Sequence, residues 1–347
     1  MKKTIERIEG DTAGISYELA VYRFDGSDKS APRAYIQAAL HGDEFPGVAA
    51  IDALMPMLKK ADAEGRILGD MTVVPWANPI GRGQYVNGAQ QGRFHLGTRT
   101  NFNRDFPLVD RPDPDLLGER ADTADGELKQ LLLRLSFGHE ILLDLHCDDE
   151  SALYLYLPKE LWPAMSDCAA AMNVEAVVLW DGPSGSSFDE ASVTPYLRSG
   201  MDLSRVVVMT AEYRGQADVD AETAQHDATG LYRLLVARGV IADTSLPPVG
   251  PYEGIAAPIE NVEMVSAPCA GMILYDVAPG ERLSAGQRIA RIVHTPGEEN
   301  GSVEVFAPQS GFLLTRLSGR SARRGDDIAK IVGDARSTDA RSGVLEA

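Results

Sequence analysis

Short apolar runs alternate with amphipathic segments along the first 245 residues. Runs such as Glu140–Leu145 are too short for a typical helix and predict buried strands. The other predicted strands span residues 34–40, 71–76, 176–180 and 205–210. Helical spacing of apolar positions predicts helices over residues 47–60, 126–135 and 221–238. This alternation favours an α/β domain with a mostly parallel or mixed sheet.

The pattern changes after residue 245. Residues 246–258 are rich in proline and glycine and are expected to form a linker. Residues 259–335 contain two copies of one unit, which begins Ala-Pro-x-x-Gly at positions 267 and 307 and ends Ile-Ala-(Arg/Lys)-Ile-Val at positions 293 and 332. The repeat predicts a small all-β sandwich or barrel, and residues 336–347 are expected to be a flexible tail.

Charge and composition exclude several classes of protein. The chain has 33 Lys and Arg against 51 Asp and Glu, a formal net charge of −18, which argues against a nucleic-acid binder. No apolar run approaches the length of a membrane span, and the first ten residues lack the apolar core of a signal peptide. The three cysteines are odd in number and widely spaced, which predicts a reduced, cytoplasmic protein.

Two segments carry candidate metal ligands at the ends of predicted strands. His41 and Glu44 are three residues apart after the strand 34–40, and His146 ends the strand 140–145. Two histidines and one glutamate form a known catalytic zinc set that leaves a position for water. Asp144, on the same strand face as His146, is expected to orient it. Taken singly, the first pair also fits a solvated loop, and His146 also fits a buried core histidine.

Two further segments carry candidate catalytic and binding groups. Arg93, Asn103 and Arg104 lie in one polar stretch, and guanidinium groups bind carbonyl and carboxylate oxygens. Arg99 lies close to Arg93 and is an alternative at this spacing. Glu212 follows an apolar strand, where a carboxylate can take a proton from a metal-activated water. The plainer alternatives are surface arginines and a helix-capping or salt-bridged glutamate.

Together, these four segments resemble the succinylglutamate desuccinylase/aspartoacylase family, which is related to the zinc carboxypeptidases. The resemblance covers residues 35–215 and implies a mixed-sheet, zinc-carboxypeptidase-like domain over residues 1–245. It also implies that His41, Glu44 and His146 hold one zinc ion per chain and that Glu212 is the general base. Arg93 matches the arginine that polarises the scissile carbonyl. Asn103 and Arg104 match the pair that holds the substrate carboxylate.

One position next to these groups departs from the family pattern. Asn101-Phe-Asn-Arg stands where the family more often has Asp-Leu-Asn-Arg, and the change leaves Asn103 and Arg104 in place. The expected function is a zinc-dependent amidohydrolase, a deacylase that cleaves the acyl amide bond of an N-acyl amino acid. A metallocarboxypeptidase acting on short peptides is the alternative within enzymes, and a non-catalytic binding or scaffold protein is the alternative outside them.

The C-terminal repeat resembles biotinyl/lipoyl carrier domains. Those domains carry their cofactor on a lysine in the hairpin between the two halves. The corresponding hairpin here, residues 294–301, has no lysine, and none occurs between Lys159 and Lys330. The carrier function is therefore contradicted. Two roles remain open for this module: it shapes or covers the mouth of the active site, or it mediates the formation of a homo-oligomer.

Overall fold

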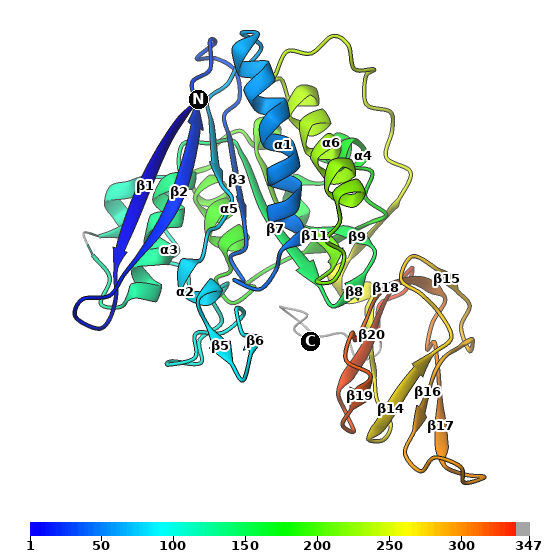
Figure 1. Cartoon of the computed structure of the whole chain (residues 1–347). Helices are drawn as coiled ribbons and strands as arrows, with labels where there is room; N and C mark the ends of the chain where they lie inside the picture. Colours follow the sequence, from blue (N-terminus) through cyan, green and yellow to red (C-terminus); the bar gives the residue numbers. More distant parts are fainter. Residues whose placement is uncertain (119, 338–347) are drawn as a thin grey trace.

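A mixed sheet of nine strands forms the centre of the computed structural model, which describes residues 1–118 and 120–337. The strand order is β1-β2-β4-β3-β7-β11-β9-β10-β12, and β3, β4, β7 and β11 run parallel to one another (Figure 1). Their bounds are β1 Lys2–Glu9, β2 Ser16–Phe24, β3 Ala34–Ala38, β4 Met71–Val74, β7 Ile141–Asp148, β9 Leu153–Pro158, β10 Ala176–Trp180, β11 Val207–Gly215 and β12 Ile255–Pro258.

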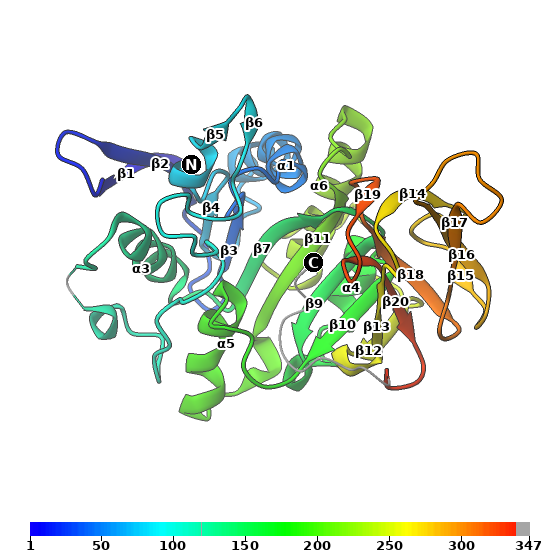
Figure 2. The ribbon, with the colours of Figure 1, turned by 90° about the horizontal axis from the view of Figure 1, so that it is seen from below.

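Helices cover both faces of this sheet (Figure 2). One face carries α1 (Pro46–Ala63), α4 (Ser166–Met172) and α6 (Ala221–Ala237), and the other carries α3 (Ala124–Ser136) and α5 (Phe188–Ser199). Because both faces are covered, β3 is buried along its whole length and β7 along all but its last residue. Short elements complete this part of the chain: α2 Pro79–Arg82, β5 Tyr85–Val86, β6 Ala89–Gln90, β8 Glu150–Ser151, η1 Pro114–Leu117, η2 Lys159–Leu161 and η3 Leu203–Arg205.

The predicted fold class is confirmed, and the predicted strands and helices are found with shifted ends. Strand 176–180 is β10 as predicted, whereas β7 extends to Asp148 and α1 begins at Pro46. The elements that were not predicted include β1, β2, β9, α4 and α5. Between the predicted strands 176–180 and 205–210, residues 181–187 form a loop that leads into the unpredicted helix α5.

Two antiparallel sheets form a β domain after the main sheet. One has the order β13-β20-β18-β15 and the other β17-β16-β14-β19. Their bounds are β13 Val262–Ser266, β14 Gly271–Tyr275, β15 Arg282–Leu283, β16 Arg288–Val293, β17 Ser302–Phe306, β18 Gly311–Arg316, β19 Ser321–Ala322 and β20 Asp327–Gly333, with η4 at Ile259–Asn261. Buried aliphatic residues such as Ile273, Ile292 and Ile331 form a separate core within this domain. The likeness to carrier domains stays a prediction.

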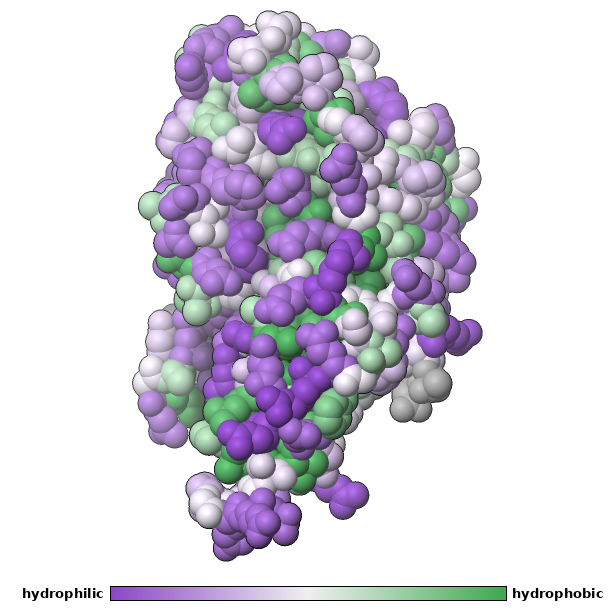
Figure 3. Space-filling model, turned by 90° about the vertical axis from the view of Figure 1, so that its right-hand side faces the viewer, coloured by the Kyte–Doolittle hydropathy of each residue, from purple (hydrophilic) through white to green (hydrophobic). Residues whose placement is uncertain are grey.

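Strand pairing joins the β domain to the preceding part of the chain. Residues 255–258, in the predicted linker, form β12 and pair with β10. The short strand β8 pairs with β18 of the β domain, and Ala152 donates its backbone N–H to the carbonyl of Leu314 at 2.9 Å. On the opposite sheet, Met272, Leu274 and Phe306 are exposed. Leu274 and Phe306 line a shallow hollow with the charged residues Asp276, Arg288, Arg291 and Glu304, and Figure 3 shows hydrophobic and hydrophilic groups interspersed on this side of the molecule.

Among the described residues, no helix has the length and apolarity required to cross a membrane. Cys147, Cys168 and Cys269 are all free thiols. Most of the predicted flexible tail, residues 338–347, lies outside the described residues.

Candidate active site

The parallel pairing of β3 and β7 brings the two predicted metal-binding segments together. Ala38 and Leu145 are register partners, so the segments that follow them emerge at the same edge of the sheet. The His41 loop is fixed there by Gly42, whose N–H donates to the carbonyl of Gly92 at 2.9 Å. A Cβ at Gly42 would lie 2.2 Å from the backbone nitrogen of Arg82, so this close approach requires glycine.

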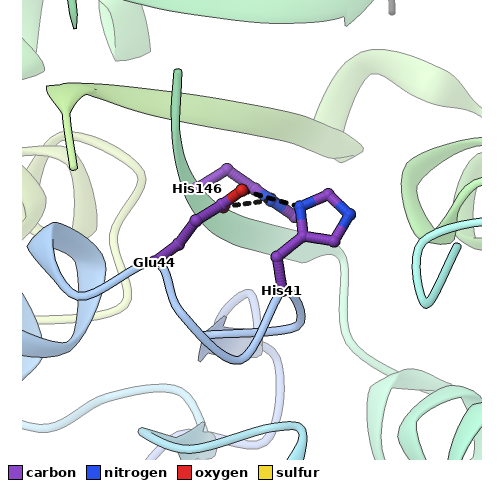
Figure 4. Close-up of side chains that lie close together, drawn as sticks. All are labelled: His41, Glu44 and His146. Carbon is purple, nitrogen blue, oxygen red and sulfur yellow. Dashed lines mark hydrogen bonds and ion pairs between the residues drawn. The ribbon is translucent and has the colours of Figure 1, made fainter. Parts of the chain in front are cut away.

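His41, Glu44 and His146 converge on one point (Figure 4). Nδ1 of His41 lies 2.7 Å from Oε1 of Glu44, and Nδ1 of His146 lies 2.8 Å from Oε2 of the same carboxylate. One donor atom from each residue lies within 4.8 Å of the other two, and all three side chains are buried. The structure therefore brings together the three residues that the sequence singles out as metal ligands.

The outer nitrogen of each imidazole has a polar neighbour of its own. Nε2 of His41 lies 2.9 Å from Oδ1 of Asn101, and Nε2 of His146 lies 2.9 Å from Oδ2 of Asp144. Gln37 donates to the other oxygen of Asp144 at 2.9 Å. With the proton on Nε2, each ring donates outward and turns the Nδ1 lone pair toward Glu44. This is the usual arrangement of metal-ligating histidines, so the donor set fits a zinc ion.

The charges in this cluster are coupled by burial and proximity. Although burial favours its neutral form, the His41 and His146 rings hold the pKa of Glu44 below its ordinary value. Burial opposes the charge of His146, yet the carboxylates of Asp144 and Glu44 raise the pKa of His146 well above the usual range. Burial lowers the pKa of His41. Glu44 is therefore a carboxylate, as a metal ligand must be.

Glu212 stands beside this cluster. It is the register partner of His146 on the adjacent parallel strand β11, so the two side chains project from the same face of the sheet. Among the described residues, its buried Oε2 atom has no hydrogen-bond partner. Burial, with the charges of Asp148 and Glu44, raises the pKa of Glu212 to about 8. A cation bound next to it would lower that pKa again.

Arg93, not Arg99, is the arginine that reaches the cluster. Its Nη1 atom lies 3.6 Å from Oε1 of Glu44 and 3.4 Å from Nδ1 of His41, and its side chain is 40% exposed. Arg99 is exposed and is not among the residues that line the cavity next to the cluster. Arg93 is thus placed where a guanidinium can contact a carbonyl oxygen held at the metal centre.

Asn103 and Arg104 are held against the loop of residues 181–187. Oδ1 of Asn103 accepts the N–H of Phe188 at 2.8 Å, and Nη1 of Arg104 donates to the carbonyl of Asn103 at 2.5 Å. The backbone N–H of Asp105 donates to the carbonyl of Gly185 at 3.1 Å. Both predicted binding residues therefore line the same cavity as the metal cluster.

The cavity has a volume of about 230 Å³. Several of its lining residues were not singled out by the sequence: Asp148, Asp149, Tyr154, Tyr156, Trp180, Asp189, Ile259 and Lys330. The last two belong to the C-terminal part of the chain and lie 113 and 184 residues beyond His146, the nearest predicted metal ligand. Because Ile259 and Lys330 lie so far along the sequence from the catalytic segments, motif-based analysis does not identify them.

Comparison with known proteins agrees with this geometry. The sequence model of the succinylglutamate desuccinylase/aspartoacylase catalytic domain matches residues 30–238. N-alpha-acetyl-L-2,4-diaminobutyric acid deacetylase from Halomonas elongata is 23% identical over 301 residues, which cover 86% of this chain and 82% of the relative.

Two solved structures show the same architecture. A succinylglutamate desuccinylase/aspartoacylase family protein from Shewanella amazonensis is 27% identical, with a TM-score of 0.83 over 96% of this chain and 99% of the other. A similarly described protein from Shewanella frigidimarina is 26% identical, with a TM-score of 0.83 over 96% and 97% of the two chains. The chain belongs to the succinylglutamate desuccinylase/aspartoacylase family, whose members are deacylases that hydrolyse amide bonds.

Proposed function

We propose that this protein is a zinc-dependent deacylase that hydrolyses the acyl amide bond of a small N-acyl amino acid. The observation that carries the proposal is that one cavity is lined by the His41–Glu44–His146 cluster, by Glu212 and by Arg104. These groups supply, in turn, metal ligands, a proton acceptor and a carboxylate-binding cation. We expect the enzyme to act in the cytoplasm.

Zinc and Glu212 have separate tasks in the proposed reaction. A bound zinc ion supplies a Lewis acid and lowers the pKa of the water it holds to about 7. Glu212 takes the proton from the attacking water, because its carboxylate lies beside His146 and its Oε2 atom has no partner among the described residues. Glu212 then delivers that proton to the leaving amine, as one carboxyl group can serve both steps.

Three side chains orient the substrate in this proposal. Arg93 donates to the carbonyl oxygen of the scissile amide, where negative charge develops in the transition state. Asn103 and Arg104 hold the substrate carboxylate and so convert binding into orientation at the reacting carbon. The guanidinium of Arg104 can donate two parallel hydrogen bonds to that carboxylate.

The size of the cavity favours a small N-acyl amino acid over a peptide. Its volume of about 230 Å³ is below the roughly 300–1,000 Å³ that is typical of pockets for drug-sized ligands. The Halomonas elongata relative is described as acting on an N-acetylated amino acid. Both points favour deacylation of a short acyl group over the carboxypeptidase alternative.

Zinc analysis and a substrate panel test the proposal. The zinc-loaded chain should contain one ion and release free amine from N-acetyl or other short N-acyl amino acids. Dipeptides of similar length serve as the comparison. Preferential cleavage of dipeptides would favour the carboxypeptidase alternative, and zinc-loaded protein that binds these compounds without hydrolysing them would favour a binding protein.

Replacing Arg104 should weaken substrate binding. We expect Arg104→Gln to raise KM roughly 10- to 100-fold, because a hydrogen bond to a charged group contributes about 1.5–3 kcal/mol. Steady-state kinetics measure the effect. The control is a substrate in which a neutral amide replaces the carboxylate: wild type and Arg104→Gln should then be equally poor. If Arg104→Gln discriminated against the amide substrate as strongly as wild type does, Arg104 would have no role in binding the carboxylate.

A further inference from the structure

Lys330 brings a charge from the C-terminal β domain into the active-site cavity. It lies on β20, its side chain is 6% exposed, and it lines the same cavity as the predicted metal ligands. Burying an ammonium group is costly unless it is paired. Its partner is Asp148 at the end of β7, whose Oδ2 atom lies 2.6 Å from Nζ of Lys330.

Asp148 links Lys330 to the strand on the far side of Glu212. The hydroxyl of Tyr154 donates to Oδ2 of Asp148 at 2.7 Å. Tyr154 lies on β9 and is the register partner of Glu212 on β11. Lys330, Asp148 and Tyr154 thus form a hydrogen-bonded wall, and all three side chains line the cavity.

Domain docking alone does not require this buried charge. The same interface contains Arg316 of β18, which pairs with Glu150 at 2.5 Å, remains 22% exposed and lies outside the cavity. The internal repeat offers a second comparison, because Arg291 occupies the position in the first copy that Lys330 occupies in the second. Arg291 is exposed on the outer sheet. The buried cation belongs to the copy that faces the active site.

We propose that Lys330 is a positioning residue of the active site, which fixes the wall formed by Asp148 and Tyr154 and thereby determines which acyl substrates fit. The inference rests on the proposed deacylase function and assigns part of it to the C-terminal domain. Of the two roles left open by the sequence, it selects the one in which this domain shapes the active site.

The test compares Lys330→Met with Arg316→Met and Arg291→Met, all as zinc-loaded, full-length protein. Methionine is unbranched like lysine and only one atom shorter, and it carries no charge. We expect Lys330→Met to lower kcat/KM by about 10²-fold, the cost of a displacement of about 1 Å near the reacting groups. It should also change the ratio of kcat/KM between N-acetyl and N-butanoyl amino acids, whereas loss of stability alone leaves that ratio unchanged. Lys330→Arg should restore part of the activity, and the two control variants should behave as wild type.

A second variant separates positioning from the cost of leaving Asp148 unpaired. Lys330→Met combined with Asp148→Asn removes both charges, so it should fold even if the single variant does not. Under the proposal, the double variant retains its zinc, and its acyl preference still differs from that of wild type. Wild-type kinetics and acyl preference in that variant would overturn the inference, as would an equal loss in Arg316→Met.

The outcome for wild type separates this inference from the proposed function. If wild type hydrolyses an N-acyl amino acid and Lys330→Met does so equally well with the same acyl preference, only the role of Lys330 is contradicted. If zinc-loaded wild type hydrolyses none, the deacylase function fails and the inference fails with it.

Discussion

The Glu212→Gln variant should retain its zinc and lose hydrolysis by about 10²- to 10⁴-fold, the range that a general acid–base group contributes. Glutamine keeps the shape of the side chain but cannot carry the proton from the water to the amine. Glu212 is the register partner of His146 and its Oε2 atom is buried, so the change acts beside the metal cluster without removing a ligand. Metal content and initial rates of amine release measure the two effects.

Two comparisons make this result specific. Glu222→Gln changes an exposed carboxylate in the first turn of α6 and should leave the rate unchanged. Full activity in Glu212→Gln would remove Glu212 from the mechanism. Loss of zinc together with activity would show instead that Glu212 supports metal binding, and the proton transfer would then need another carrier.

The sequence predicts best those elements whose side chains are sorted between core and solvent. The helix at residues 221–238 was predicted because its apolar positions recur with helical spacing, and α6 is found at Ala221–Ala237. In contrast, the first nine residues of α5, from Phe188 to Tyr196, are all buried, and Pro195 lies inside it. A helix that is buried on all sides has no amphipathic period to detect, so α5 was missed.

The N-terminal hairpin was missed for a different reason. Strand β1 is mostly exposed, and only Ile8 is buried in it. It pairs with β2 at the edge of the sheet, where neither face must be apolar. Its sequence, rich in Lys, Arg and Glu, therefore lacks the apolar alternation by which a half-buried strand is recognised.

The candidate site divides in the same way. His41, Glu44 and His146 stand at the ends of apolar strands, where the sequence indicates both their location and their chemistry. The role of Asn101 as a partner of His41 could not be read from spacing, because it depends on how the 93–104 segment packs over the His41 loop.

Lys330 was missed because its repeat counterpart, Arg291, has the same local sequence and no contact with the site. Which copy of the repeat faces the cavity is decided by the pairing of β8 with β18.

Replacing His146 by alanine should remove the zinc ion. The three donor atoms lie within 4.8 Å of one another, and loss of one leaves two ligands, too few for a catalytic zinc site. We expect affinity to fall by more than the roughly 10- to 100-fold that loss of a ligand's outer partner costs. Dialysis against a weak chelator followed by metal analysis measures this loss. The thermal midpoint gives a second readout, because a ligand that binds the folded state raises it: zinc should raise it in wild type but not in His146→Ala.

His139 provides the matched control for this substitution. It is partly buried, and its Nδ1 atom donates to the carbonyl of Ser136 at 3.0 Å while its Nε2 atom lies 3.1 Å from Oγ1 of Thr72, away from the metal cluster. His139→Ala should therefore lower stability while retaining zinc, which separates the loss of a metal ligand from the loss of a histidine that only supports the fold. If His146→Ala keeps its zinc through dialysis, the ion is held by other groups, and the mechanism that rests on His41, Glu44 and His146 is wrong. If His146→Ala loses its zinc and His139→Ala does not, strand β7 positions a metal ligand at the edge of the sheet where β3 ends.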